Sequence, residues 1–153
     1  MEKRHSWKLK LELSFNVHAT EDERRLLQVL KKVFDLEEPL FSKTVFEGYH
    51  GNPILKYNLS TKGLVADKVF TTIFKRLDPL DRERLLNSIG QNIDSTNVFY
   101  LRLNKSSLFE EKFRLGGSNT FHFKFKPRIR YLEDANVFYA ELILESSGMK
   151  QNV

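Results

Sequence analysis

Strict alternation of apolar and polar residues is the feature that most restricts the fold of this 153-residue chain. Residues 7–18 read WKLKLELSFNVH, and residues 120–126 read TFHFKFK. Because successive strand side chains point to opposite faces, both segments predict strands with one buried and one solvated face. Strands of a parallel sheet are usually apolar throughout, so this pattern favours an antiparallel sheet that is covered on one side.

Other segments have apolar residues at helical spacing. Thr20 with Glu23 forms a capping-box pattern, and Asp78 before Pro79 is a typical helix start. The predicted helices cover residues 21–34, 63–77 and 79–89.

Shorter strands are predicted at residues 43–48, 54–60 and 97–104. Residues 135–146 fit either a strand or a helix, and Asp134 and Gly148, as start and stop signals, favour a helix. No repeat or linker divides the chain. We therefore expect a single α+β domain over residues 1–153, with a mainly antiparallel sheet and helices packed on one face.

The composition is that of a soluble globular protein, with 41% hydrophobic and 29% charged residues. No apolar run approaches the roughly 18 residues of a membrane span, and residues 1–10 are too polar for a signal peptide. We therefore expect a cytoplasmic protein that does not contact membranes. The absence of cysteine excludes disulfides, thiolate zinc sites and thiol nucleophiles.

Positive charge is concentrated in one segment of the chain. The formal net charge is +5, from 25 Lys and Arg against 20 Asp and Glu. Residues 112–131 contain six of these basic residues and no acid, so the rest of the chain has 19 basic against 20 acidic residues. Such a segment predicts a polyanion-binding surface, although charge that only keeps the protein soluble is an alternative. The six are Lys112, Arg114, Lys124, Lys126, Arg128 and Arg130.

The solvated sides of the first, fourth and last predicted strands carry cations and an aromatic ring. If these strands are neighbours, they form an open basic surface of the kind that pairs with RNA phosphates and stacks unpaired bases. Solubility and protection of sheet edges are the competing explanation. The residues concerned are Lys8, Lys10, Tyr100, Arg102, His122, Lys124 and Lys126.

The segment GYHGNP at residues 48–53 is typical of a tight turn, and it predicts a hairpin or a sharp corner. Tyr49, His50 and Asn52 are candidate RNA contacts, while Gly48, Gly51 and Pro53 would shape the turn. Taken alone, the segment is better explained by the turn than by an RNA contact.

No pattern indicates catalysis, a metal or a cofactor. The chain has no serine nucleophile elbow and no phosphate-binding glycine loop with its lysine, and its four histidines lack the spacing of a helical metal site. The acids Asp78, Asp81 and Glu83 are better explained by capping of a helix than by a catalytic cluster.

Three segments together resemble a known family: VHATEDE at residues 17–23, EGYHGNPI at 47–54 and YLRLNK at 100–105. They are similar to an archaeal family of predicted RNA-binding proteins that is described as exosome-associated. The resemblance implies an α+β fold similar to that of the fifth large-subunit ribosomal protein, or to double-stranded-RNA-binding domains. Carried over by matching positions, it also implies roles for Gly48, Gly51, Asn52, Pro53, Arg102 and Lys105.

The function predicted from these observations is non-catalytic RNA binding, accessory to archaeal RNA processing or degradation. RNA would be the main partner, with the exosome or other RNA-processing proteins as further candidates. The alternative is a subunit that docks to proteins of such an assembly without touching RNA. The oligomeric state remains open.

Overall fold

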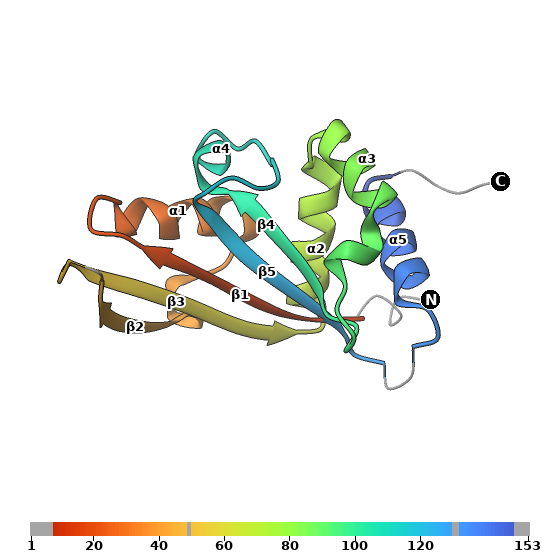
Figure 1. The fold of residues 1–153 in the computed structure, drawn as a ribbon, viewed down its shortest axis with the longest axis horizontal. Coiled ribbons are helices and arrows are strands. Elements are labelled where there is room, and N and C mark those ends of the chain that lie inside the picture. Colours follow the sequence, from red (N-terminus) through yellow and green to blue (C-terminus); the bar gives the residue numbers. More distant parts are fainter. Residues whose placement is uncertain (1–7, 49, 130–131, 149–153) are drawn as a thin grey trace.

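A five-stranded antiparallel sheet, in the order β2-β3-β1-β5-β4, forms the centre of the fold (Figure 1). The structure is a computed structural model that describes residues 8–48, 50–129 and 132–148. The strands of the described part are β1 (Leu9–Val17), β2 (Ser42–Glu47), β3 (Pro53–Lys62), β4 (Phe99–Asn104) and β5 (Thr120–Pro127). The helices are α1 (Glu23–Phe34), α2 (Leu64–Arg76), α3 (Pro79–Asn87), α4 (Lys105–Phe109) and α5 (Ala135–Ser146), with short 3₁₀ turns η2 (Glu38–Leu40) and η3 (Ile89–Asn92).

Helices cover one face of the sheet, as the alternation predicts. The ring of Phe34 in α1 lies 5.7 Å from that of Phe123 in β5, and Phe70 in α2 lies 5.0 Å from Phe125. In Figure 1, α1 and α2 pass behind the strands. The predicted α+β class with a one-sided antiparallel sheet is therefore confirmed.

The buried face of the sheet is built from the apolar half of each alternating strand. The three phenylalanines of β5 are at most 1% exposed, and they belong to one continuous core. On β1 the buried residues are Leu9, Leu11, Leu13, Phe15 and Val17. Trp7, which the alternation also places inward, lies outside the described residues.

The start of α1 differs from the prediction. The N-cap is Asp22, whose carboxylate accepts from the backbone N–H of Arg25 at 3.3 Å, so the capping box at Thr20 is wrong. The carboxylate of Glu21 instead accepts from the backbone N–H of His18 at 3.0 Å. Glu21 is thereby held outside the helix, which matters for the polar cluster described below.

The segment 135–146 is the helix α5, and Asp134 caps it by accepting from the N–H of Val137 at 3.3 Å. β2 and β3 pair as an antiparallel hairpin, as predicted, with Glu47 opposite Pro53. The N–H of Gly48 donates to the carbonyl of Asn52 at 2.6 Å, and a Cβ on Gly48 would lie 2.9 Å from that oxygen. The hairpin explains why glycine occupies position 48.

None of the helices in the described ranges is both long and apolar enough to span a membrane. Within the same ranges, no group of three or more His, Asp and Glu residues could hold a metal ion.

Candidate nucleic-acid interface

The three strands that carry the predicted basic surface are neighbours. β5 lies between β1 and β4 and pairs with both. The even-numbered residues of these strands therefore share the face that none of the described helices covers, which we call the open face. It includes β3, whose polar residues continue the same rows. Its members are Lys10, Glu12, Ser14, Asn16, Lys56, Asn58, Ser60, Lys62, Tyr100, Arg102, His122, Lys124 and Lys126.

Strand register places cations of the open face in rows. Lys10 of β1 lies opposite Lys62 of β3 on one side and Lys126 of β5 on the other. Neighbouring strands are about 4.8 Å apart, so this row presents three positive charges over roughly 10 Å. A second row joins His122 to Arg102. Such rows match the repeated charges of a nucleic-acid backbone.

The lysines and arginine of the open face form no ion pair with another described residue. All of them are solvent-exposed: Lys10, Lys56, Lys62, Arg102, Lys124 and Lys126. Their charges are therefore available to an external anion. Lys56 and Lys62 were not among the predicted contacts, although the alternating polar residues of 56–62 could have revealed them.

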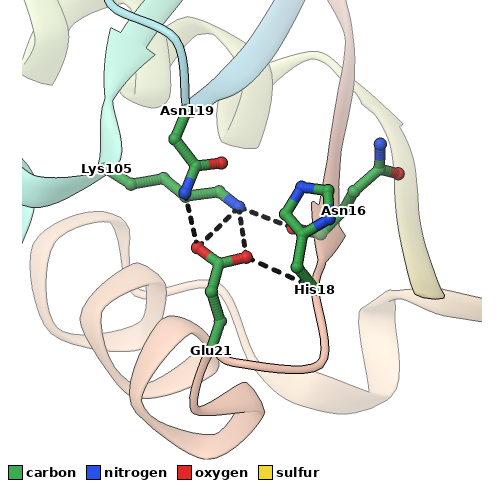
Figure 2. Close-up of polar contacts among 5 residues, drawn as sticks. All are labelled: Asn16, His18, Glu21, Lys105 and Asn119. Carbon is green, nitrogen blue, oxygen red and sulfur yellow. Dashed lines mark hydrogen bonds and ion pairs between the residues drawn. The ribbon is translucent and has the colours of Figure 1, made fainter. Parts of the chain in front are cut away.

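Lys105 is not an exposed cation of this surface. Its side chain is 2% exposed, and its ammonium donates to the carbonyl of Asn16 at 2.5 Å and to both carboxylate oxygens of Glu21 at 3.1 and 3.2 Å (Figure 2). The amide of Asn119 donates to the same carboxylate at 2.7 Å. The family resemblance implies a role for Lys105, and in the structure its buried ammonium ties the start of α1 to the ends of β1 and β4.

The pKa of Glu21 reflects this cluster. Partial burial alone would raise it, but hydrogen bonds from the His18 backbone, Asn119 and Lys105 outweigh that effect and hold the pKa below its ordinary value. The Glu21 carboxyl therefore carries its negative charge at neutral pH.

Two other predicted cations lie away from the open face. Arg114 donates through Nε to Asp81 of α3 at 3.0 Å, and the buried Asp81 carboxylate also accepts from the N–H of Leu115 at 2.9 Å. Lys112 is exposed in the loop after α4, and its Nζ lies 3.8 Å from Oε1 of Glu110. Both belong to the loop that leads into β5.

The remaining predicted contacts lie at the ends of the sheet or outside the described part. Arg128 follows β5 and is exposed, and its backbone N–H donates to the carbonyl of Lys8 at 2.7 Å. His50 and Asn52 are exposed in the hairpin turn, with Gly51 at φ +81° and Pro53 opening β3. Tyr49 and Arg130 lie outside the described residues.

Tyr100 is fixed at the β4 edge of the open face. Its hydroxyl donates to Asp94 Oδ2 at 2.7 Å, and this bond raises the pKa of Tyr100. The Lys124 ammonium lies 5.7 Å from the centre of the Tyr100 ring. The ring is therefore a fixed apolar element among cations, and it is 39% exposed.

Among the described residues, three hollows lie along the open face. A hollow of about 370 Å³ lies between Tyr100 and Lys10, and one of about 340 Å³ lies between β1 and β3 at Ser60. A third, of about 180 Å³, is lined by polar groups that include His122 and Lys56. Together these hollows form recesses in the open face that can accommodate groups of an extended polymer.

Comparisons with known proteins show the family of this chain. A family model described as RNA binding matches residues 10–126. RNA-binding protein PAB1135 of Pyrococcus abyssi is 28% identical over 118 residues, covering 73% of this chain and 77% of that protein.

Solved structures share the fold. Protein AF2318 from Archaeglobus fulgidus matches with a TM-score of 0.70 and 23% identity, covering 88% of this chain and 99% of that one. Mth689, a DUF54 protein from Methanothermobacter thermautotrophicus, matches with a TM-score of 0.69 and 21% identity, covering 91% and 98%. Since the family model spans most of the chain, this protein belongs to the RNA-binding family that the model describes.

Proposed function

We propose that this protein binds RNA on the open face without catalysing a reaction, as an accessory factor in RNA processing or degradation. The observation that carries the proposal is the set of six exposed lysine and arginine side chains on this face, none of which forms an ion pair with another described residue. Cations that are not neutralised by the protein's own acids can release counterions from a phosphate backbone.

Single-stranded RNA is the form that the open face fits best. Bases of a single strand can turn towards a sheet and pack on aromatic rings, whereas the bases of an A-form helix are largely inaccessible. Tyr100 supplies such a ring, and the hollows beside it supply space.

The proposal is tested by titrating labelled single-stranded and hairpin RNAs at two salt concentrations. We expect affinity to fall with a slope of roughly 0.7 in log K per log salt for each phosphate contact to a single strand. Absence of binding to either RNA at low salt would contradict the proposal.

RNA binding should also strengthen as pH falls from about 8 to about 6 through protonation of His122. Partial burial lowers the pKa of His122, and the charges of Arg102, Lys105, Lys124 and Lys56 lower it further. A bound phosphate offsets the positive charges around His122, so the pKa of His122 rises on binding and the complex takes up a proton. We expect affinity to rise by about 3–10-fold, since one pKa unit corresponds to tenfold.

Fluorescence anisotropy at the two pH values measures this effect. His122→Gln should remove the added pH dependence, while His18→Gln, in the same hollow, serves as the matched control. An unchanged pH profile in His122→Gln would show that no phosphate lies next to this ring.

A second candidate function is protein docking through the outer edge of β2. This strand pairs with β3 alone among the described strands, and Val45 and Phe46 on it are 60% and 42% exposed. An edge with exposed apolar side chains can accept a strand from a partner. Co-purification with and without nuclease separates this function from RNA binding. A partner held by protein contacts should still co-purify after nuclease treatment.

A further inference from the structure

One carboxylate lies in the middle of the basic open face. Glu12 of β1 faces Ser60 on one side and Lys124 on the other, and its side chain is exposed. Its carboxylate forms no side-chain hydrogen bond or ion pair with any other described residue. On a surface that only attracts phosphates, this negative charge would weaken binding. We therefore expect the Glu12 carboxylate to meet a ligand group that donates hydrogen bonds to it.

Glu12 lines both of the larger hollows of the open face. The hollow of about 370 Å³ also contains Tyr100, Lys10 and Lys126, and its volume falls within the range of about 300–1,000 Å³ that is typical of small-ligand pockets. The hollow therefore has room for a nucleobase between an aromatic wall and cations that can hold the flanking phosphates.

The other carboxylate of this hollow, Asp94, is already engaged. Its Oδ1 accepts from the N–H and hydroxyl of Thr96 and from the N–H of Val98, and its Oδ2 accepts from the Tyr100 hydroxyl. These bonds hold the pKa of Asp94 far below its ordinary value. Glu12 is thus the carboxylate of the hollow that accepts no hydrogen bond from another described residue.

The chemistry of a free carboxylate selects among the four bases. Its two oxygens only accept hydrogen bonds and can take two parallel donors. Guanine presents the N1–H and the N2 amino group side by side on its Watson–Crick edge. Adenine and cytosine place an acceptor nitrogen beside their amino group, and uracil flanks one N–H with two carbonyls. In unpaired RNA this edge of guanine is accessible.

We propose that Glu12 recognises an unpaired guanine in RNA bound to the open face, through hydrogen bonds to N1–H and the N2 amino group. The base occupies the hollow beside Tyr100, while Lys10, Lys124 and Lys126 hold the neighbouring phosphates. This inference rests on the proposed RNA binding and adds to it a base preference and the residue that sets it.

The test compares three labelled eight-nucleotide RNAs: all uridine, uridine with one central guanosine, and the same strand with inosine, which lacks the N2 amino group. The wild-type protein should bind the guanosine strand at least about fivefold more tightly than the uridine strand, the lower limit for a bidentate base contact. The inosine strand should fall between them. Glu12→Gln should lose this preference.

The sign of the mutational effect separates recognition from simple repulsion. Glu12→Gln removes a negative charge, so it should strengthen binding of the uridine strand while weakening that of the guanosine strand. Glu141→Gln, an exposed carboxylate on α5, makes the same charge change away from the open face and should leave the preference intact. Equal strengthening of all three strands by Glu12→Gln would overturn the inference alone, whereas no binding of any strand by the wild type at low salt would overturn the proposed function as well.

Discussion

Replacing Lys10, Lys62 and Lys126 together with glutamine is expected to weaken RNA binding about 100-fold at low salt. These three residues form one row across β3, β1 and β5, and none of them has an ion-pair partner among the described residues. A hydrogen-bonded phosphate contact is worth roughly 1 kcal/mol or more, and tenfold in affinity corresponds to about 1.4 kcal/mol. The slope of log K against the logarithm of salt concentration should become shallower by roughly 0.7 for each contact that is lost.

A matched variant makes this result specific to the open face. Lys68→Gln, Lys75→Gln and Arg84→Gln together remove the same charge from exposed positions on α2 and α3. That triple variant should keep most of the affinity, because its residues lie on the side of the helices. Equal losses in the two triple variants would mean that binding follows net charge and not the open face. Melting temperatures should stay near that of the wild type in both, since all six side chains are on the surface.

Lys105→Met is expected to lower the free energy of unfolding by about 3 kcal/mol, the largest single-residue effect on stability that we predict. The substitution leaves the Glu21 carboxylate and the Asn16 carbonyl without their buried cation (Figure 2). Removing one partner of a buried pair typically costs about 3–5 kcal/mol, and the lower end applies because Glu21 remains 18% exposed.

Urea denaturation of single and double variants measures this cost. Lys112→Met, at a side chain that is 71% exposed, should change stability by less than about 0.5 kcal/mol. Adding Glu21→Gln to Lys105→Met should restore part of the loss, since it removes the unpaired charge. If Lys105→Met is no more destabilising than Lys112→Met, the ammonium is not buried as described.

The outward and inward residues of β1, β4 and β5 could be predicted from sequence because alternation depends only on local backbone geometry. The order of the strands could not, because one-sided amphipathic strands of similar length can pair in several arrangements. The location of β5 between β1 and β4 decides whether Lys124 and Arg102 share a surface. That location comes from how the helices pack on the phenylalanine face, which is a property of the whole fold.

Lys105 shows the corresponding limit for the candidate site. The residues next to Lys105 in the sequence would be the same whether its side chain were exposed or buried. Its partner Glu21 lies 84 positions away, and α4, the short helix that begins with Lys105, was not among the predicted helices. Burial and pairing of this kind emerge only when the ends of β1, β4 and α1 meet.

Site-specific photo-crosslinking tests the central claim, that RNA lies on the open face, most directly. Because the chain contains no cysteine, single cysteines at Ser60→Cys on the open face and Thr71→Cys on α2 can each carry a benzophenone label. Both wild-type residues are exposed and uncharged, so neither substitution changes the electrostatics. We expect labelled Ser60→Cys to crosslink single-stranded RNA efficiently and labelled Thr71→Cys to remain near background. Crosslinking mainly from Thr71→Cys would contradict the open face as the RNA-binding surface.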